Sequence, residues 1–592
     1  MTPRSVHPNE QTVLDAVSTD RLMEATEAIA QWERLSGTDD EARAFDWIEA
    51  RLREYGLHPV RHEHPGLVSW PESASLIITT GDGRREEIPC ATHAFGLSTP
   101  NEGLSSLLVD AGNGSVEELA DEDVRSRIVL VDGIIAPNRN LTVESAGVAG
   151  SIWIAGSRLH ERGLSPIWGT PTPETANLLP RTPSVSVLAE HGQRIKELIA
   201  DGPVTATIHT KVYTGWRHLP LLTADIEPVR DNRDAHTFVL FSGHVDSWYY
   251  GAMDNGTANA TMLEVAAILT SHRDELRRGM RLAFWSGHSH ARYAGSAWYA
   301  DEFWLELHDR CVAHINVDSV GAIGASVLSE GNNMAELREF VSDAIEPIAG
   351  QRLTRRRFGR AGDQSFWGVG MPAALMSLSA QPPENADPVL LALHDQIAGG
   401  KSASGGLGSW WHTPEDTLDK IDPDNLHRDA SIYALLLYRL CTALVLPFDY
   451  RLTVSEFRER VQELQQAARD AFDLSRLLAE IDSLSNRLQQ LQPLVDRDLD
   501  DAAAQRVNKC LTEIGHALIP VDYTAMGQFD HDLATPTSPI PGLSRIPELA
   551  ALDPTGSDYQ LLLTRLRRER NRATHGIRSA RRSVEAALRD LN

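Results

Sequence analysis

The stretch TFVLFSGHVDSWYYGAMDNGTANATMLEVAAILTSH (Thr237–His272) decides the fold, because it joins a strand to a helix through a polar loop. TFVLFSGH is typical of a buried β-strand, and NATMLEVAAILTSH has the apolar spacing of a helix. Strand-like segments recur at MRLAFWSG and CVAHINVDSVG, and SIYALLLYRLCTALV reads as an apolar helix. This alternation over residues 216–450 predicts an α/β sheet covered by helices on both faces.

The pattern of apolar, Gly and Pro residues differs on both sides of residues 216–450. Residues 10–56 show helical spacing of apolar residues, and YGL supplies a glycine stop after them. Residues 75–215 show short strands, Gly and Pro turns and small α/β units, which predict an inserted β-rich domain. We therefore expect residues 1–74 to be an N-terminal part of the core domain and residues 75–215 to be a separate domain.

Residues 451–592 form the last predicted domain and are almost wholly helical in pattern. Apolar residues at spacings of four and three predict a helix that packs in a bundle and that Pro493 ends. These positions are Leu477, Ile481, Leu484, Leu488 and Leu491.

The composition excludes several classes of protein. The chain has 592 residues and a net charge of −26, which argues against binding to nucleic acid or to an anionic membrane surface. It has no apolar run long enough for a transmembrane helix, and its N-terminus lacks the apolar core of a signal peptide. Its four cysteines form no CxxC pair, which argues against a disulfide scaffold or a cysteine zinc site. We expect a cytoplasmic protein.

Four polar clusters follow predicted strands or turns, where α/β sheets build their sites. The first contains His244, Asp246 and Asp254, and the second is GHSHARYAGS (Gly287–Ser296). The other two contain Asp318, in INVDSVG, and His412, in WWHTPEDTLDKI. Each cluster taken alone has an ordinary explanation as turn or helix-capping residues.

Taken together, the clusters predict a centre for two divalent metals. Imidazole and carboxylate groups are ligands that zinc selects, and a two-metal site needs one bridging carboxylate. Asp254 can bridge, His244 and Asp318 can serve one metal, and His412 with a residue of Gly287–Ser296 can serve the other. Asp246, two residues after His244, is predicted to accept the second N–H of that histidine.

The order H-x-D, G-A-x-D-N, a polar turn ending in G-S, N-x-D-S and H-T-P-E-D-T resembles the M28 metallopeptidases. GHVDSWYYGAMDN and INVDS are closer to the glutamate carboxypeptidase and transferrin receptor branch of that family. The resemblance implies a zinc-exopeptidase (phosphorylase/hydrolase-like) three-layer sandwich with two metals, usually zinc. Through RIVLVDG, SAGVAGSIWIAG and PSVSVLAEHG, residues 75–215 resemble a protease-associated domain. Residues 451–592 resemble, more weakly, the helical dimerisation domain of the branch, which implies a homodimer.

The family resemblance also implies roles for the site residues. His244, Asp254 and Asp318 would bind one metal, and Asp254, His412 and a glutamate the second. A preceding glutamate would be the general base. Here both glutamates are missing, and the turn between Gly287 and Gly295 is one residue longer than in the family.

The longer turn can be matched to the family in two ways. Counting back from Gly295 puts Ser289 in the base position and His290 in the ligand position, whereas counting forward from Gly287 puts His288 and Ser289 there. Serine is a poor zinc ligand and neutral histidine a good one. We therefore predict that His290 binds the second metal and that His288 stands in as the base.

These residues favour a metal-dependent hydrolase that cleaves an amide bond in a peptide or peptide-like small molecule. One alternative is a lyase or deacylase acting on a non-peptide metabolite. Another is a non-catalytic dimeric binding protein of the transferrin receptor type, which the missing glutamates would suit. Substrate contacts are predicted for residues near the motifs, namely Arg292, Tyr293, Asp363, Gln364 and Trp411.

Overall fold

A mixed β-sheet forms the centre of the core part. The computed structural model describes residues 6–591 except residues 121, 231, 376, 398–400 and 496. The strand order in the core is β12 (Ala373–Ala374), β11 (Cys311–Asn316), β9 (Phe238–His244), β10 (Gly279–Trp285) and β8 (Val204–Ile226). The first four strands run parallel, and β8 pairs antiparallel with β10. Every residue of β9 is buried, which explains its continuous apolar sequence.

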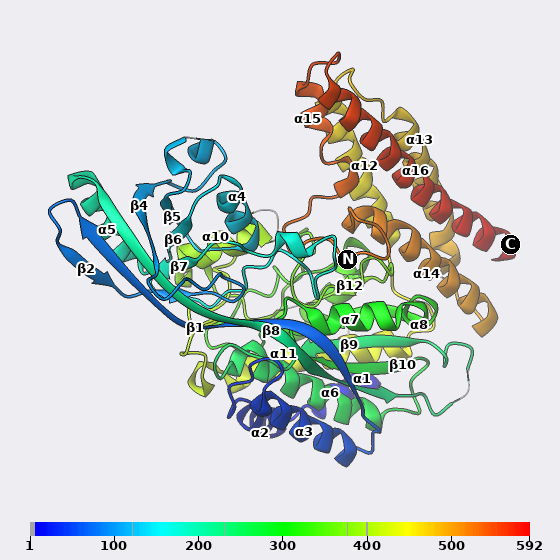
Figure 1. Ribbon diagram of the computed structural model, residues 1–592. Helices are drawn as coiled ribbons and strands as arrows, with labels where there is room; N and C mark the ends of the chain where they lie inside the picture. Colours follow the sequence, from blue (N-terminus) through cyan, green and yellow to red (C-terminus); the bar gives the residue numbers. More distant parts are fainter. Residues whose placement is uncertain are drawn as a thin grey trace.

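Helices cover both faces of this sheet (Figure 1). One face packs against α2 (Thr19–Ile29), α3 (Asp39–Glu54), α6 (Ala258–Ser271) and α11 (Pro423–Thr442) in the largest apolar core. The other face packs against α7 (Ala294–Glu302) and α8 (Trp304–Arg310). The other α-helices described in this part are α1 (Pro8–Asp15), α9 (Arg338–Ala349) and α10 (Pro388–Ile397). The predicted three-layer sandwich is confirmed.

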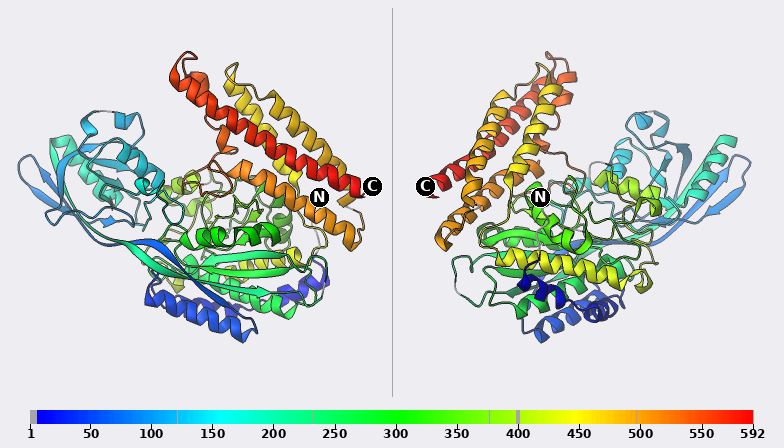
Figure 2. Two further views of the ribbon diagram at one scale, coloured as in Figure 1. Left: turned by 45° about the vertical axis from the view of Figure 1, so that its right-hand side comes forward. Right: turned by 180° about the vertical axis from the view of Figure 1, so that it is seen from behind.

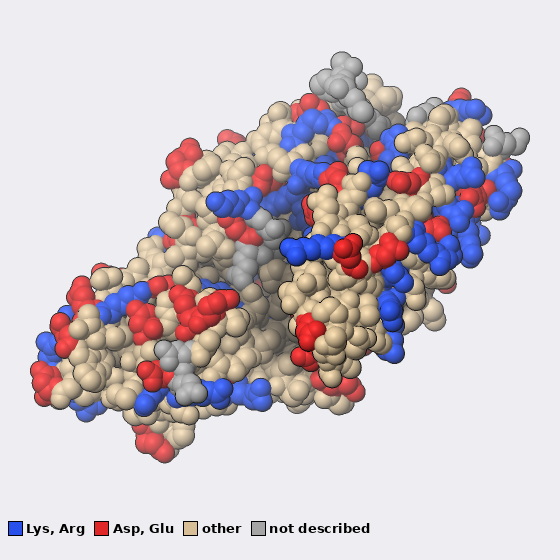
Figure 3. Space-filling view, turned by 90° about the horizontal axis from the view of Figure 1, so that it is seen from above, with Lys and Arg blue, Asp and Glu red and all other residues tan. Residues whose placement is uncertain are grey.

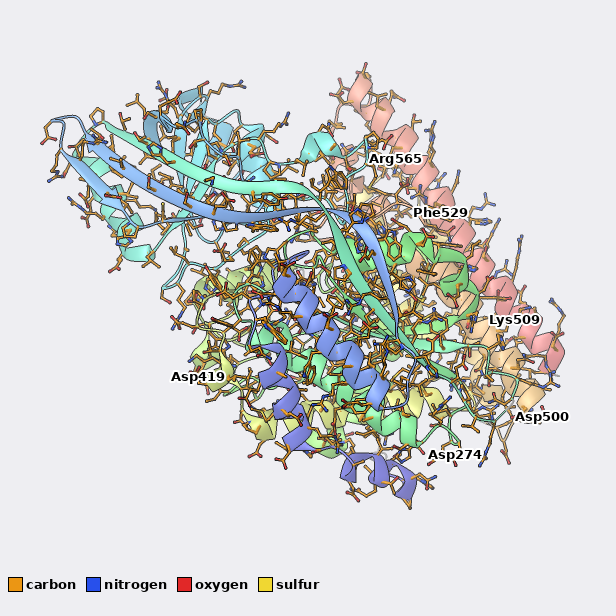
Figure 4. All side chains as sticks on the ribbon, turned by 60° about the horizontal axis from the view of Figure 1, so that its bottom comes forward. Asp274, Asp419, Asp500, Lys509, Phe529 and Arg565 are labelled. Atoms are coloured by element: carbon orange, nitrogen blue, oxygen red, sulfur yellow. The ribbon has the colours of Figure 1, made fainter. Side chains whose placement is uncertain are left out.

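Two long strands connect the core part to the insert. β1 (Val60–Thr80) pairs antiparallel with β8 from Val60 opposite Thr223 to Thr80 opposite Val204, with a shift in register near Pro71. Figure 4 follows the two strands across the molecule. The predicted boundaries at residues 74/75 and 215/216 therefore fall inside continuous strands, since the two strands are shared by both parts.

The insert carries its own small α/β sheet. β4 (Leu104–Asp110), β5 (Ile128–Asp132), β6 (Gly150–Ile154) and β7 (Ser184–Val187) run parallel, and β4 joins the sheet to β8. The remaining elements are β2 (Arg85–Ile88), β3 (Ala91–Thr92), α4 (Pro137–Ser145) and α5 (Ala189–Asp201). RIVLVDG contains β5, and SAGVAGSIWIAG spans the end of α4, a turn and β6.

The helical part stands on the same side of the core part as the insert (Figures 1 and 2). Its helices are α12 (Tyr450–Ala468), α13 (Ser475–Val495), α14 (Asp501–Tyr523), α15 (Ile546–Ala551) and α16 (Ser557–Leu591). The five predicted bundle positions of α13 are all buried. Pro493 does not end this helix, which continues to Val495, because a proline so close to the C-terminus removes only one hydrogen bond of the last turns. No described helix is long and apolar enough to cross a bilayer.

Candidate metal centre

Four of the five predicted ligands meet at the carboxyl ends of the parallel strands, and His290 does not join them. His244 is the last residue of β9, Asp254 lies in the turn before α6, and Asp318 follows β11. His412 comes from a turn more than ninety residues further along the chain and has a left-handed backbone (φ 58°). The sheet therefore brings together residues that the sequence separates widely.

The first half of the centre is formed around His244. Its Nε2 lies 3.2 Å from Asp254 Oδ1 and 3.6 Å from Asp318 Oδ2. Donor atoms about 2.1 Å from a zinc ion lie roughly 3.4 Å apart at the corners of a tetrahedron. These side chains are therefore spaced as ligands of one metal, and the donor set of imidazole and carboxylate fits zinc.

The second half shares Asp254. The other oxygen of that carboxylate, Oδ2, lies 3.0 Å from His412 Nε2. Asp254 thus stands between two imidazoles, as a bridging carboxylate has to. Among the described residues, a group of three or more ligands forms only in the first half, from His244, Asp318 and His288.

The charges of these groups support each other. Burial alone would lower the pKa of His244, but Asp246, Asp254 and Asp318 outweigh it and raise that pKa well above its usual value. Burial would raise the pKa of Asp254, but His244 and His412 hold it below its usual range. In the absence of metal, the carboxylates thus stabilise a proton on His244, which a metal ion would replace.

Backbone carbonyls orient two of the histidines. His244 Nδ1 lies 2.8 Å from the carbonyl oxygen of Asp246, and His412 Nδ1 lies 2.8 Å from that of Glu161. A carbonyl oxygen only accepts hydrogen bonds, so each Nδ1 carries a proton and each neutral ring keeps its Nε2 lone pair for the centre. The insert, through Glu161, therefore helps to position His412.

Asp246 differs in detail from its predicted role. Its carboxylate accepts hydrogen bonds from the backbone N–H groups of His288 (3.1 Å) and Ser289 (2.7 Å) and from the hydroxyl of Ser36 (2.9 Å). Its nearer oxygen is 3.7 Å from His244 Nδ1, beyond hydrogen-bonding distance. Asp246 therefore orients His244 with its backbone and the His-Ser-His turn with its side chain.

The two histidines of that turn point in different directions. His288 lines the cavity beside the centre and stacks on His244, with ring centroids 3.7 Å apart. His290 is fully buried, packs on Trp248 and places Nδ1 3.0 Å from Ser36 Oγ. The structure thus brings His288, and not His290, to Asp318.

A cavity of about 190 Å³ lies beside the ligands and is lined by all three parts of the chain. Figure 3 shows the surface hollowed between the insert and the helical part. Of the predicted catalytic and substrate contacts, His288, Ser289, Arg292, Tyr293 and Trp411 line the cavity. Asp363 and Gln364 do not line it. Asp363 instead holds His288, and Gln364 is buried and hydrogen-bonded to the carbonyl of Gly362.

Sequence reasoning missed several residues around the centre. Arg34 is buried and donates to the carbonyls of Val245, Tyr250 and Gly251, so it fixes the loop that follows His244. Asp416 accepts hydrogen bonds from the backbone of Met253 and Asp254, and burial raises its pKa to about 7. The polar run after His412 in HTPED was the one signal for Asp416, whereas Arg34 lies in a loop with no motif.

Arg162, in the insert, also lines the cavity. Its guanidinium lies over the ring of Trp411 (5.3 Å), and its Nε is buried without a hydrogen-bond partner among the described residues. Burial and the neighbouring Arg292 lower its pKa to about 10. Two cations therefore stand together at the wall of the cavity.

Comparison with known proteins agrees with this geometry. Residues 224–437 match the family described as Peptidase family M28. Residues 224–437 form an M28 peptidase domain. The match covers four of the predicted ligands in the strand-end loops, together with His412.

Similar proteins extend beyond the M28 domain. The chain is 22% identical to a probable glutamate carboxypeptidase VP8 from Zea mays, over 82% of this chain and 76% of the relative. It is 25% identical to aminopeptidase NAALADL1 from Mus musculus, over 46% of this chain and 37% of the relative.

Solved structures show the same fold. An aminopeptidase from Aneurinibacillus sp. strain AM-1 superposes with a TM-score of 0.55 and 20% identity, over 73% of this chain and 95% of that chain. A zinc aminopeptidase from Bacillus subtilis superposes with a TM-score of 0.51 and 20% identity, over 74% of this chain and 96% of that chain. The α/β sandwich of the M28 domain is thus shared with zinc aminopeptidases.

Proposed function

We propose that this protein is a metal-dependent hydrolase that cleaves an amide bond in a peptide-like small molecule. The observation that carries the proposal is the position of Asp254, whose two oxygens lie 3.2 Å from His244 Nε2 and 3.0 Å from His412 Nε2. The M28 domain and its carboxypeptidase and aminopeptidase relatives support the same reaction class.

The residues of the chain have separable tasks in this reaction. His244, Asp254 and Asp318 hold a divalent metal, and Asp254 with His412 can hold a second. Zinc bound there supplies Lewis acidity and an acidified water molecule. His288 and Ser289 line the cavity next to these ligands, which is the position that the predicted stand-in base needs.

We propose further that the substrate carries a carboxylate. Arg162 and Arg292 stand side by side on the cavity wall, and Arg162 Nε has no partner among the described residues. A buried cation without a counter-charge is costly, and a carboxylate bound between the two guanidinium groups would offset that cost. The ring of Trp411 packs against the Arg162 guanidinium, 5.3 Å away.

Paired substrates test this proposal. Zinc-loaded protein is assayed with peptides and N-acyl amino acids that end in a free carboxylate, and with the matching carboxamides. We expect kcat/KM at least tenfold higher for the carboxylates, since a charged hydrogen bond is lost in the amides. Arg162→Met should remove this preference mainly by raising KM, by about 10–100-fold for the carboxylates alone.

Arg125→Met is the matched control, because Arg125 is an exposed arginine of the same insert. It should leave both substrate series unchanged. Equal rates for carboxylates and carboxamides would disprove the carboxylate site. Failure of zinc-loaded protein to cleave any compound would disprove the hydrolase.

A non-catalytic binding protein is the second candidate, and the absence of both glutamates from the turn favours it. Metal analysis separates the two. A protein that takes up less than roughly a tenth of an equivalent of zinc, after dialysis against it, cannot be a zinc hydrolase.

We propose also that the insert is a protease-associated domain, that the helical part mediates a homodimer and that the protein is cytoplasmic. Arg162 and Gly163 of the insert line the cavity, which supports a role for this domain at the site. For the helical part, exposed Leu561 on α16 and exposed Phe529 support a contact surface. Light scattering of the purified protein measures the oligomeric state directly.

A further inference from the structure

We infer that His288, oriented by Asp363, is a ligand of the metal held by His244 and Asp318, and that His290 is not a ligand. This inference rests on the metal centre of the proposed function and changes which histidine of the turn serves it. It replaces the predicted roles of a base for His288 and a ligand for His290.

The tautomer of His288 suits a metal ligand. Its Nδ1 lies 2.9 Å from Asp363 Oδ2. A carboxylate only accepts hydrogen bonds, so Nδ1 carries a proton and Nε2 keeps its lone pair. His244 and His412 have the same arrangement through their carbonyl partners. A histidine that donates Nδ1–H to a carboxylate while its other nitrogen faces a metal is a recurrent arrangement in zinc sites.

His290 lies in a different environment. Its Nδ1 is 3.0 Å from Ser36 Oγ and 3.3 Å from the backbone nitrogen of Ser36, and the Ser36 hydroxyl itself donates to Asp246. Its ring is fully buried against Trp248 and does not line the cavity. Among the described residues, the group of ligand atoms around His244 contains His288 and Asp318 but not His290.

The position of His288 also suits a metal ligand. Single ligand atoms of His288, His244 and Asp318 all lie within 4.8 Å of one another. The rings of His288 and His244 stack face to face, with an inclination of 13°, so the two imidazoles lie at the same point of the centre. A tetrahedral zinc requires donor atoms about 3.4 Å apart, so binding would draw these atoms together and rotate the two rings until their lone pairs converge.

Asp363 is itself held in place. Its other oxygen accepts a hydrogen bond from Ser296 Oγ (2.9 Å), and Ser296 Oγ lies 2.9 Å from Ser365 Oγ. Trp168 Nε1 in the insert donates to that same Ser365 hydroxyl at 2.8 Å. Such a chain of polar contacts fixes the carboxylate that positions His288, so Asp363 acts as a positioning residue rather than a substrate contact.

The consequence is an unequal pair of metal sites. The first has two imidazoles and two carboxylates, from His244, His288, Asp254 and Asp318, and this donor set balances the charge of a zinc ion. The second has Asp254 and His412 alone among these residues. The geometry therefore points to one tightly bound zinc per chain and a weaker second one.

Zinc binding to metal-free protein tests the inference without any substrate. Affinity is measured by competition with a chromophoric chelator, and coordination by the visible absorption of the cobalt form. His288→Ala should weaken the tight site by more than about 100-fold, and Asp363→Asn by about 10–100-fold. Asparagine is chosen because it tolerates the left-handed backbone of Asp363 (φ 57°).

His290→Ala is the matched control in the same turn. It should keep the tight site within about threefold and leave the cobalt spectrum unchanged. His288→Gln replaces His288→Ala if thermal unfolding shows that the alanine variant does not fold.

Two results would overturn the inference while leaving the proposed function intact. One is a His288→Ala protein that keeps its zinc affinity but loses turnover, which would make His288 the base. The other is loss of zinc in His290→Ala. A wild-type protein that binds no zinc would overturn the proposed function itself.

Discussion

The two halves of the metal centre are built on different supports. In the first, His244, Asp318 and the His288 turn all follow strands of one sheet, and each backbone is fixed by the strand before it. In the second, His412 lies in a turn outside the sheet and takes its orientation from Glu161 of the insert. The first half belongs to the core fold, whereas the second depends on how the insert packs against it.

The same difference bears on the turn at Gly287–Ser296. By its resemblance to the M28 motifs, this turn lacks the two glutamates expected of it, whereas His244, Asp254 and Asp318 stand where the motifs place them. As a metal ligand, His288 would give the first half a donor from this same turn.

Removal of the shared residue should have the largest effect. Asp254→Asn leaves an amide between His244 and His412 and takes a negative charge from both halves. We expect loss of both metals and a fall in turnover of more than about a thousandfold, since both halves lose a bridging ligand. Metal analysis after dialysis measures the loss, and retention of one equivalent would show that the halves are independent.

Single removals from each half should differ from one another. His244→Ala should weaken the first equivalent of zinc by more than about 100-fold, whereas His412→Ala should change it by less than about tenfold. Calorimetric titration of metal-free protein with zinc resolves the two equivalents. If the two variants lose the first equivalent alike, the centre has no stronger half.

A buried acid away from the centre should have no effect on metal binding, and so separates loss of metal from loss of fold. Glu336 accepts a hydrogen bond from Thr453 of α12 (2.7 Å), and burial raises its pKa to about 7. The unfolded chain ionises this group near pH 4.5, so the protonated group stabilises the fold at low pH. That stabilisation is lost as the pH rises from about 4.5 to 7.

Glu336→Gln should remove this pH dependence. Its free energy of unfolding relative to wild type should increase by about 3 kcal/mol between pH 4.5 and pH 7 and stay level above that. Denaturant unfolding at a series of pH values measures it, with zinc content unchanged. A constant difference across the series would mean that Glu336 ionises normally in the folded protein.

The sequence predicted the regular parts of this structure well. The strands before His244 and before Gly287 and the buried helix α6 follow from apolar patterns that local residues determine. The predicted domain boundaries fall inside the shared strands β1 and β8. The full length of these strands depends on pairing between residues more than a hundred positions apart, which local sequence does not reveal. The prediction that Pro493 ends α13 is wrong, because the effect of a proline depends on how much helix follows it, and α13 continues only to Val495.

The loops that carry the metal ligands were predictable from local sequence, whereas the orientation of the two histidines in the turn at Gly287–Ser296 was not. His244, Asp254, Asp318 and His412 each lie in a recognisable motif. The direction of His288 and His290 is set by Asp363 and Ser36, which lie far from the turn in the sequence. Counting residues between two glycines carries no information about those partners.

The insert is joined to the core part by the paired strands β1 and β8, so it could be deleted by joining these two strands to each other. Trp70 stands opposite Tyr213 in the core half of the paired strands. A two-residue Asn-Gly turn between them would close the remaining strands as a β-hairpin. The shortened chain would retain its metal ligands in the sheet and lose the wall that carries Arg162. Because the insert also supplies the Glu161 carbonyl that orients His412, its removal would leave the first half of the metal centre on the sheet and take away a support of the second.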